Sequence, residues 1–166
     1  IHIPGLLQTA DHARALFNQV VPQLRQDEVE HRLSHRMKRQ AILFGENPTP
    51  YTAIIHEAAL RMQFGGPTTT RKQLDHLLQM SELPNISVRV IPFSHGTFPG
   101  SGQSFDYVHG QVPQLDTVQL DAHHGCEFLD SEAQLNKYRT VLDRMEKDAL
   151  DEKQSRDFIH DILKST

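Results

Sequence analysis

The stretch from Asn85 to Val108 constrains the fold of this chain more than any other segment. Ile86, Val88 and Val90 alternate with polar residues, which predicts a strand, and a second alternating run follows at residues 104–109. Prolines and glycines fill the segment between the two runs. Because an isolated strand cannot bury its apolar face, we expect this strand–turn–strand unit to form the middle of a sheet with helices packed on it.

Periodic patterns along the rest of the chain predict the elements around this unit. Apolar residues recur at intervals of three and four in segments predicted as helices, which span residues 9–21, 27–44, 57–64, 70–81, 131–150 and 155–164. N-cap residues are expected at Thr9, Asp27, Thr70, Ser131 and Ser155. Strands are predicted near residues 51–56, 86–93, 104–109 and 117–124. The order of elements favours an α+β fold in which a small, mostly antiparallel sheet is layered with helices.

The length and charge of the chain limit its class. With 166 residues, of which 37% are hydrophobic, the chain fits one domain with one core. Its formal net charge of −4 argues against a nucleic-acid surface in these residues, because binding to phosphates needs clustered Lys and Arg. We therefore treat residues 1–166 as one domain that does not itself contact DNA.

Two further features bear on location and on what surrounds the domain. No apolar run approaches the ~20 residues of a membrane-spanning helix, and the single cysteine, Cys126, excludes an intramolecular disulfide and suits a reducing compartment. We expect a cytoplasmic protein with no membrane partner. Because the chain begins at Ile1 and reaches Pro4-Gly5 at once, we also expect it to be a fragment of a longer protein.

Eleven histidines raise the hypothesis of a metal site. Two of them lie four residues apart in the predicted 27–44 helix, but on the face opposite its apolar stripe, where imidazoles are solvated. Asp121, His123 and Glu127 point to one side of the predicted strand that begins at residue 117, and zinc needs at least three such ligands. A metal-dependent enzyme or metal-responsive switch that uses these residues is therefore the alternative function.

Catalysis at Cys126 would need more than a thiol. A cysteine nucleophile requires an adjacent base, an oxyanion donor and an orienting group, and the sequence supplies no such set. Cys126 points the same way as Val118 and Leu120 in the predicted alternation, which favours a small core residue. The glycines within residues 96–102 lie between strands, so they do not form a phosphate loop. We therefore expect no enzyme activity and no cofactor.

The predicted 131–150 helix carries a regular apolar seam. Its apolar residues, from Leu135 to Ala149, alternate at spacings of three and four, which amounts to two heptads. Two heptads are too few for a free-standing coiled coil, so we expect the seam to pack on the sheet. A homodimer formed through this helix is the alternative.

Four segments together resemble a known family. They are PGLLQTADHARALF from Pro4, HEAALRMQFGG from His56, QLDHLLQMSELPNISVRVIPFSHGTFPGSGQSFDYV from Gln73, and EFLDSEAQLNKYRTVLDRMEKDAL from Glu127. This combination resembles the actinobacterial domain of unknown function that follows an Xre-type helix-turn-helix in antitoxin-like transcriptional regulators. The chain departs from that pattern at His56, where an aspartate is usual, and at residues 123–126.

The resemblance implies a regulatory module without catalytic residues. DNA contact would come from a helix-turn-helix domain that precedes this one, and the partner would be a small protein encoded nearby or a second copy of the chain. We place the ligand or partner site in a groove between the predicted 57–64 helix and the glycine-rich turn at residues 95–103. The residues assigned to it are Glu57, Arg61, Phe64, His95 and Phe98.

Overall fold

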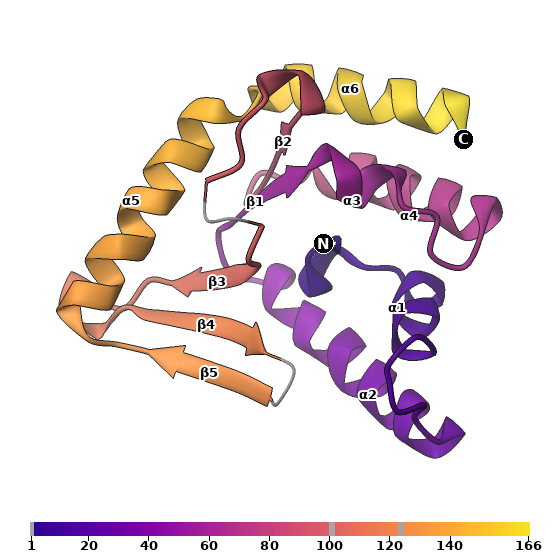
Figure 1. Ribbon diagram of the computed structural model, residues 1–166, viewed down its shortest axis with the longest axis horizontal. Helices are drawn as coiled ribbons and strands as arrows, with labels where there is room; N and C mark the ends of the chain where they lie inside the picture. Colours follow the sequence, from indigo (N-terminus) through magenta and orange to yellow (C-terminus); the bar gives the residue numbers. More distant parts are fainter. Residues whose placement is uncertain (1, 100–101, 123–124) are drawn as a thin grey trace.

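The computed structural model describes residues 2–99, 102–122 and 125–166. Its α-helices are α1 (Ala10–Phe17), α2 (Gln26–Arg39), α3 (Glu57–Arg61), α4 (Pro67–Met80), α5 (Glu132–Asp148) and α6 (Glu152–Ser165). Its strands are β1 (Tyr51–His56), β2 (Ile86–Ile91), β3 (Phe105–Val108), β4 (Thr117–Ala122) and β5 (Gly125–Leu129). Short 3-10 turns add η1 (Gly5–Leu7), η2 (Gln40–Leu43), η3 (Phe93–His95) and η4 (Pro113–Leu115). This mixture confirms the α+β class (Figure 1).

The strands divide between two sheets. β1 and β2 pair in parallel, and β3, β4 and β5 form a separate antiparallel sheet in that order. The prediction that the two strands of the Asn85–Val108 unit lie together in the middle of one sheet is therefore wrong. The helices α3 and α4 bring β2 back parallel to β1, and the segment after β2 carries the chain to the second sheet.

The parallel sheet lies in the larger core. Residues of η1, α3, α4 and α6 pack against it, among them Leu7, Leu60, Leu74 and Ile159, which are all fully buried. The outer edge of β2 is covered by the chain that leads into α6: Leu150 N–H donates to the Val90 carbonyl at 2.9 Å. Among the described residues, no helix is long and apolar enough to cross a membrane.

The antiparallel sheet packs on α5, as the seam predicts. Val118, Leu120 and Leu129 lie against Leu135 and Tyr138 of that helix. Figure 1 shows α5 extending from this sheet to the start of α6, so that it connects the two layers. The apolar seam is thus used within the chain.

The predicted helix starts are correct at two positions and shifted at three. The N-caps of α1, α2, α4, α5 and α6 are Thr9, Arg25, Gly66, Ser131 and Asp151. Pro67 in the first turn of α4 has no N–H to satisfy, which allows that helix to begin before Thr70. Ser155, predicted as a cap, is instead buried inside α6, where its Oγ accepts the Val90 N–H at 3.0 Å.

Candidate functional site

The carboxyl ends of β1 and β2 meet at one edge of the parallel sheet, where His56 pairs with Ile91. β1 runs directly into α3, and β2 leads through Pro92 into η3. Ligands of open parallel sheets bind at the carboxyl ends of the strands, because the loops that leave the sheet there converge. The predicted groove residues of α3 and of the 95–103 turn are brought towards this edge.

Glu57 fastens α3 to η3. Its side chain is almost fully buried, with 6% of the residue exposed. One carboxylate oxygen accepts from Arg61 Nε at 2.6 Å, and the other accepts from the Phe93 N–H at 2.7 Å. Because both oxygens have a donor, the buried charge is compensated. The Glu57–Arg61 pair is thus internal, which leaves only the exposed side of Arg61 for a ligand.

His56 lies between two phenylalanines at the start of α3. Its Nδ1 accepts the Ala58 N–H at 3.2 Å, so it caps the helix as an aspartate would at the same place. The ring centroid lies 5.3 Å from that of Phe93 and 4.8 Å from that of Phe98. Phe93 is 54% exposed, whereas Phe98 is half-buried. These three rings, the aromatic strip, offer apolar surface to a partner.

The end of η3 and the segment that follows it are tied to the end of α5. His95 Nε2 lies 3.0 Å from one carboxylate oxygen of Asp148, and Thr97 Oγ1 donates to the other at 3.2 Å. Asp148 is the last residue of α5, where the helix dipole disfavours a negative charge. The His95 and Thr97 contacts offset that cost and hold the segment against the helix.

A hollow of about 360 Å³ opens between this segment and α5. It is lined by Thr97, Phe98, Pro99, Arg144, Lys147 and Asp148. Arg144 and Lys147 are exposed and follow one another by one helical turn. Within the described ranges neither makes an ion pair. We call the hollow together with the aromatic strip the α5 groove.

Phe64 is the predicted site residue that lies elsewhere. Its ring packs against His2 and His12, with centroids 5.5 Å and 5.8 Å away. The other four predicted residues lie near one another. Arg61 donates to Glu57, and Glu57 accepts the Phe93 N–H of η3. His95 is the last residue of η3, and the Phe98 ring contacts His56, which also contacts Phe93. Sequence reasoning missed Arg144, Lys147 and Asp148, because nothing local marks an exposed helical residue as the neighbour of a distant turn.

A model of the family described as "Domain of unknown function (DUF5753)" matches residues 1–161 of the chain. The chain belongs to this family. No curated protein and no solved structure matches the chain. The match supports a domain of unknown function over nearly the whole chain.

The alternative metal residues of this DUF5753 domain are not brought together in the described part of the chain. β4 ends at Ala122 and β5 returns antiparallel, so Asp121 pairs with Cys126 while Leu120 pairs with Glu127. Asp121 and Glu127 therefore point to opposite faces, because cross-strand partners share a face. His123 lies outside the described residues. Among those described, no group of three His, Cys, Asp or Glu side chains is placed to hold a metal ion.

Cys126 is exposed, so the prediction of a small core residue is wrong. The hairpin reversal between β4 and β5 breaks the single alternation on which that prediction depended. The thiol donates to Asp121 Oδ1 at 3.3 Å, and this hydrogen bond, with partial burial and the nearby charge of Asp121, raises the pKa of Cys126. A thiol held in its protonated form is a poor nucleophile.

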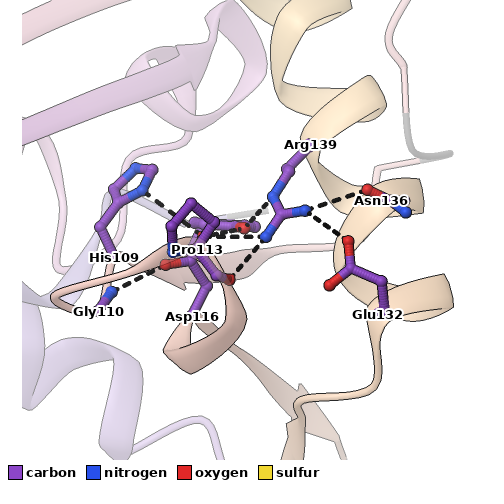
Figure 2. Close-up of polar contacts among 8 residues, drawn as sticks. His109, Gly110, Pro113, Asp116, Glu132, Asn136 and Arg139 are labelled. Carbon is purple, nitrogen blue, oxygen red and sulfur yellow. Dashed lines mark hydrogen bonds and ion pairs between the residues drawn. The ribbon is translucent and has the colours of Figure 1, made fainter.

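A second polar cluster of the domain lies between the β3–β4 loop and α5 (Figure 2). Asp116, which is 4% exposed, accepts from Tyr107 Oη at 2.6 Å, the Gly110 N–H at 2.8 Å and Arg139 Nη2 at 3.2 Å. These donors, Tyr107 first, lower the pKa of Asp116. Asp116 therefore closes the loop on itself and binds it to α5.

Arg139 uses all three of its nitrogens in this cluster. Figure 2 shows its guanidinium between the loop and α5, with contacts to both. Besides Asp116, it donates to Tyr107 Oη at 2.7 Å and to the Pro113 carbonyl at 2.8 Å. Its remaining contacts are Glu132 at 3.2 Å and Asn136 at 3.0 Å. We call these residues the Asp116–Arg139 network, and its role is to fasten the sheet to α5.

His12 is a buried polar residue that sequence reasoning did not single out. It is 1% exposed, and neither ring nitrogen has a hydrogen-bond partner among the described residues. Burial, followed by the charges of His2 and Arg36, lowers the pKa of His12 to about 4. Its neighbours Ala13 and Phe17 on α1 are buried too, so the apolar face of the helix was the available signal.

Proposed function

We propose that this domain is the sensor and interaction module of a helix-turn-helix transcriptional regulator of the antitoxin-like kind. In this proposal it acts in the cytoplasm and binds a small protein encoded nearby, or a ligand, at the α5 groove. DNA contact is assigned to a separate helix-turn-helix domain, and self-association of the module is an additional arrangement. Membership of a family of unknown function is compatible with this role, and the resemblance described above supports it.

The observation that carries the proposal is a contrast at the α5 groove. Some of its side chains are bonded within the chain, whereas others are exposed to solvent and lack ion pairs in the described structure. Glu57 and Asp148 already have donors, so they are engaged in holding the groove together. The exposed ring of Phe93 and the cations of Arg144 and Lys147 are turned to solvent. Exposed aromatic and cationic groups on a rigid frame favour binding of a partner over proton transfer.

Calorimetric titration with the small protein encoded beside the gene tests this proposal. We expect heat of binding, together with slower amide exchange at residues 93–99 and 141–148 in the complex. Phe93→Ser should weaken binding by about tenfold or more, because it removes an exposed aromatic anchor.

Phe128→Ser is the matched control, since Phe128 is 65% exposed on the other sheet. This variant should bind as the unmodified chain does. Absence of heat, or protection confined to the antiparallel sheet, would contradict the assignment of the partner to the α5 groove.

A further inference from the structure

We infer that the α5 groove binds an acidic peptide segment that carries an apolar anchor residue. This inference rests on the proposed function and names the chemistry of the partner at the same site. The segment would lie across the end of α5, with carboxylates on Arg144 and Lys147 and the anchor on the aromatic strip.

The charge of the groove favours an acidic partner. The hollow is lined by two cations, Arg144 and Lys147, and by one carboxylate, Asp148, so its lining is net positive in a chain whose formal net charge is −4. Complementary charge steers an approaching partner and fixes its orientation. A segment rich in Asp or Glu would be attracted to Arg144 and Lys147.

The carboxylate in the lining offsets only one of the two cations. Asp148 is held by His95 and Thr97 on the side of the turn. Asp143 and Glu146 belong to the same helix but do not line the hollow. The charged residues that line the hollow therefore sum to a positive charge.

Apolar surface next to the cations supplies a place for the anchor. Phe98 packs against Met145 and Ala149 of α5, which gives the groove a firm base. His56 joins Phe98 to Phe93, and the Phe93 ring remains largely exposed. Charge alone gives weak and mobile binding at a surface, so an aromatic or aliphatic anchor on this strip is needed to fix the register.

The shape of the groove favours a peptide over an enclosed small molecule. The hollow holds about 360 Å³ and is open to solvent on one side. Small-molecule sites surround most of the surface of their ligand, whereas an open hollow beside exposed aromatic rings suits a segment of chain laid along it.

Fluorescence anisotropy with three labelled peptides tests the inference on the 166-residue chain. Each peptide has about twelve residues with one central phenylalanine, and the flanking residues are glutamates, serines or lysines. We expect the glutamate peptide to bind at least about tenfold more tightly than the serine peptide, the lysine peptide to bind more weakly still, and high salt to reduce the difference.

Charge reversal at two sites distinguishes binding at the α5 groove from attraction to positive charge anywhere on the chain. Arg144→Glu/Lys147→Glu should weaken the glutamate peptide by about tenfold or more. Lys153→Glu/Arg156→Glu reverses an exposed pair with the same spacing on α6 and should change affinity less than about twofold. If charge reversal disturbs folding, Arg144→Gln/Lys147→Gln provides the test instead, because it removes the two charges without reversing them. It should also weaken binding of the glutamate peptide.

Equal losses in the two reversed pairs would overturn the inference, as would a serine peptide that binds as well as the glutamate peptide. If that serine peptide still depends on Phe93, the groove binds a partner and only the acidic chemistry is wrong. If the glutamate peptide binds as expected while the neighbouring protein gives no heat, the proposed partner is wrong and the acidic-segment site stands.

Discussion

The Asp116–Arg139 network and the α5 groove contain similar side chains, yet they use them differently. In the network, every nitrogen of Arg139 has an acceptor and both oxygens of Asp116 have donors. In the groove, Asp148 is engaged, but Arg144 projects from the same helix without an ion pair among the described residues. Since both arginines lie on α5, the residue type does not decide the role. The presence of a loop with spare acceptors opposite Arg139 does.

His12 extends this comparison to a group that is buried and has no hydrogen-bond partner in the part of the chain that the structure describes. A buried donor or acceptor without a partner costs free energy, and a buried charge without a partner costs more. The described residues thus include buried polar groups with partners, exposed cations without ion pairs, and a buried polar group without a partner. The following predictions test whether these arrangements have different consequences for stability.

The largest effect is expected from protonation of His12. Its folded-state pKa is about 4 against 6.5 for the free side chain, so the unfolded chain binds a proton first as the pH falls. The stability that depends on neutral His12 is fully present above pH 6.5 and is lost as the pH falls towards 4, by about 2–3 kcal/mol. Urea unfolding of the unmodified chain and of His12→Leu across this range measures it.

The difference between the two chains isolates His12, because all other titrating groups are shared. We expect the unmodified chain to lose stability relative to His12→Leu as the pH falls. If the free energies of unfolding of the two chains changed with pH in parallel, protonation of His12 would not destabilise the fold, and the prediction would be wrong.

Gly110→Ala should give the next largest effect, by disturbing the loop of the network. A Cβ at this position would lie 2.7 Å from backbone atoms of Leu115, which cannot move aside without opening the loop. We expect a loss of about 1–3 kcal/mol in chemical unfolding.

Gly5→Ala is the control for this change, because its Cβ would meet only the flexible Arg36 side chain at 3.6 Å or more. That variant should stay within about 0.5 kcal/mol of the unmodified chain. Equal losses for the two alanines would mean that the loop tolerates displacement.

The smallest effect is expected when the two arginines of α5 are each replaced by lysine and the melting temperatures are compared. Arg139→Lys replaces a planar group with three bonded nitrogens by a single ammonium, so the melting temperature should fall by roughly 2–4 °C. Arg144→Lys keeps a cation at a site without ion pairs in the described structure, and its melting temperature should not change.

Differential scanning calorimetry of the two variants under the same conditions gives the comparison directly. A similar fall for both lysines would indicate that Arg144 has a structural partner. A similar absence of change would mean that the network does not hold the sheet to α5.

Local features of the candidate site were predictable. The Glu57–Arg61 pair follows from its spacing of four on a helix, and the turn around Phe98 was recognisable from its glycines and prolines. His56 and Phe93 were not assigned to the site, because their contact depends on how β1 and β2 align. The same holds for Asp148, which meets Thr97 across 51 positions of sequence.

The strand errors have the same physical origin. β1 lies at the residues predicted for it, since alternation within a strand is a local property. The pairing of β2 with β1 joins residues far apart in the sequence, and neither the period nor the turn residues encode it. The pattern of residues after 117 also predicts one alternating strand, although these residues form the two strands β4 and β5. For that reason the exposure predicted for Cys126 is wrong.

The sequence by itself determined the α+β class, the positions of most helices and strands, and the membership of the chain in a family. These properties depend on periodic burial and on residue order, which are present in the chain before it folds. Only the tertiary structure decided that the strands form two sheets, that Arg139 is satisfied while Arg144 is exposed, and that the turn after β2 meets the end of α5. Each of these depends on which distant groups become neighbours, and the free energy of such contacts is set by packing and desolvation in the folded chain.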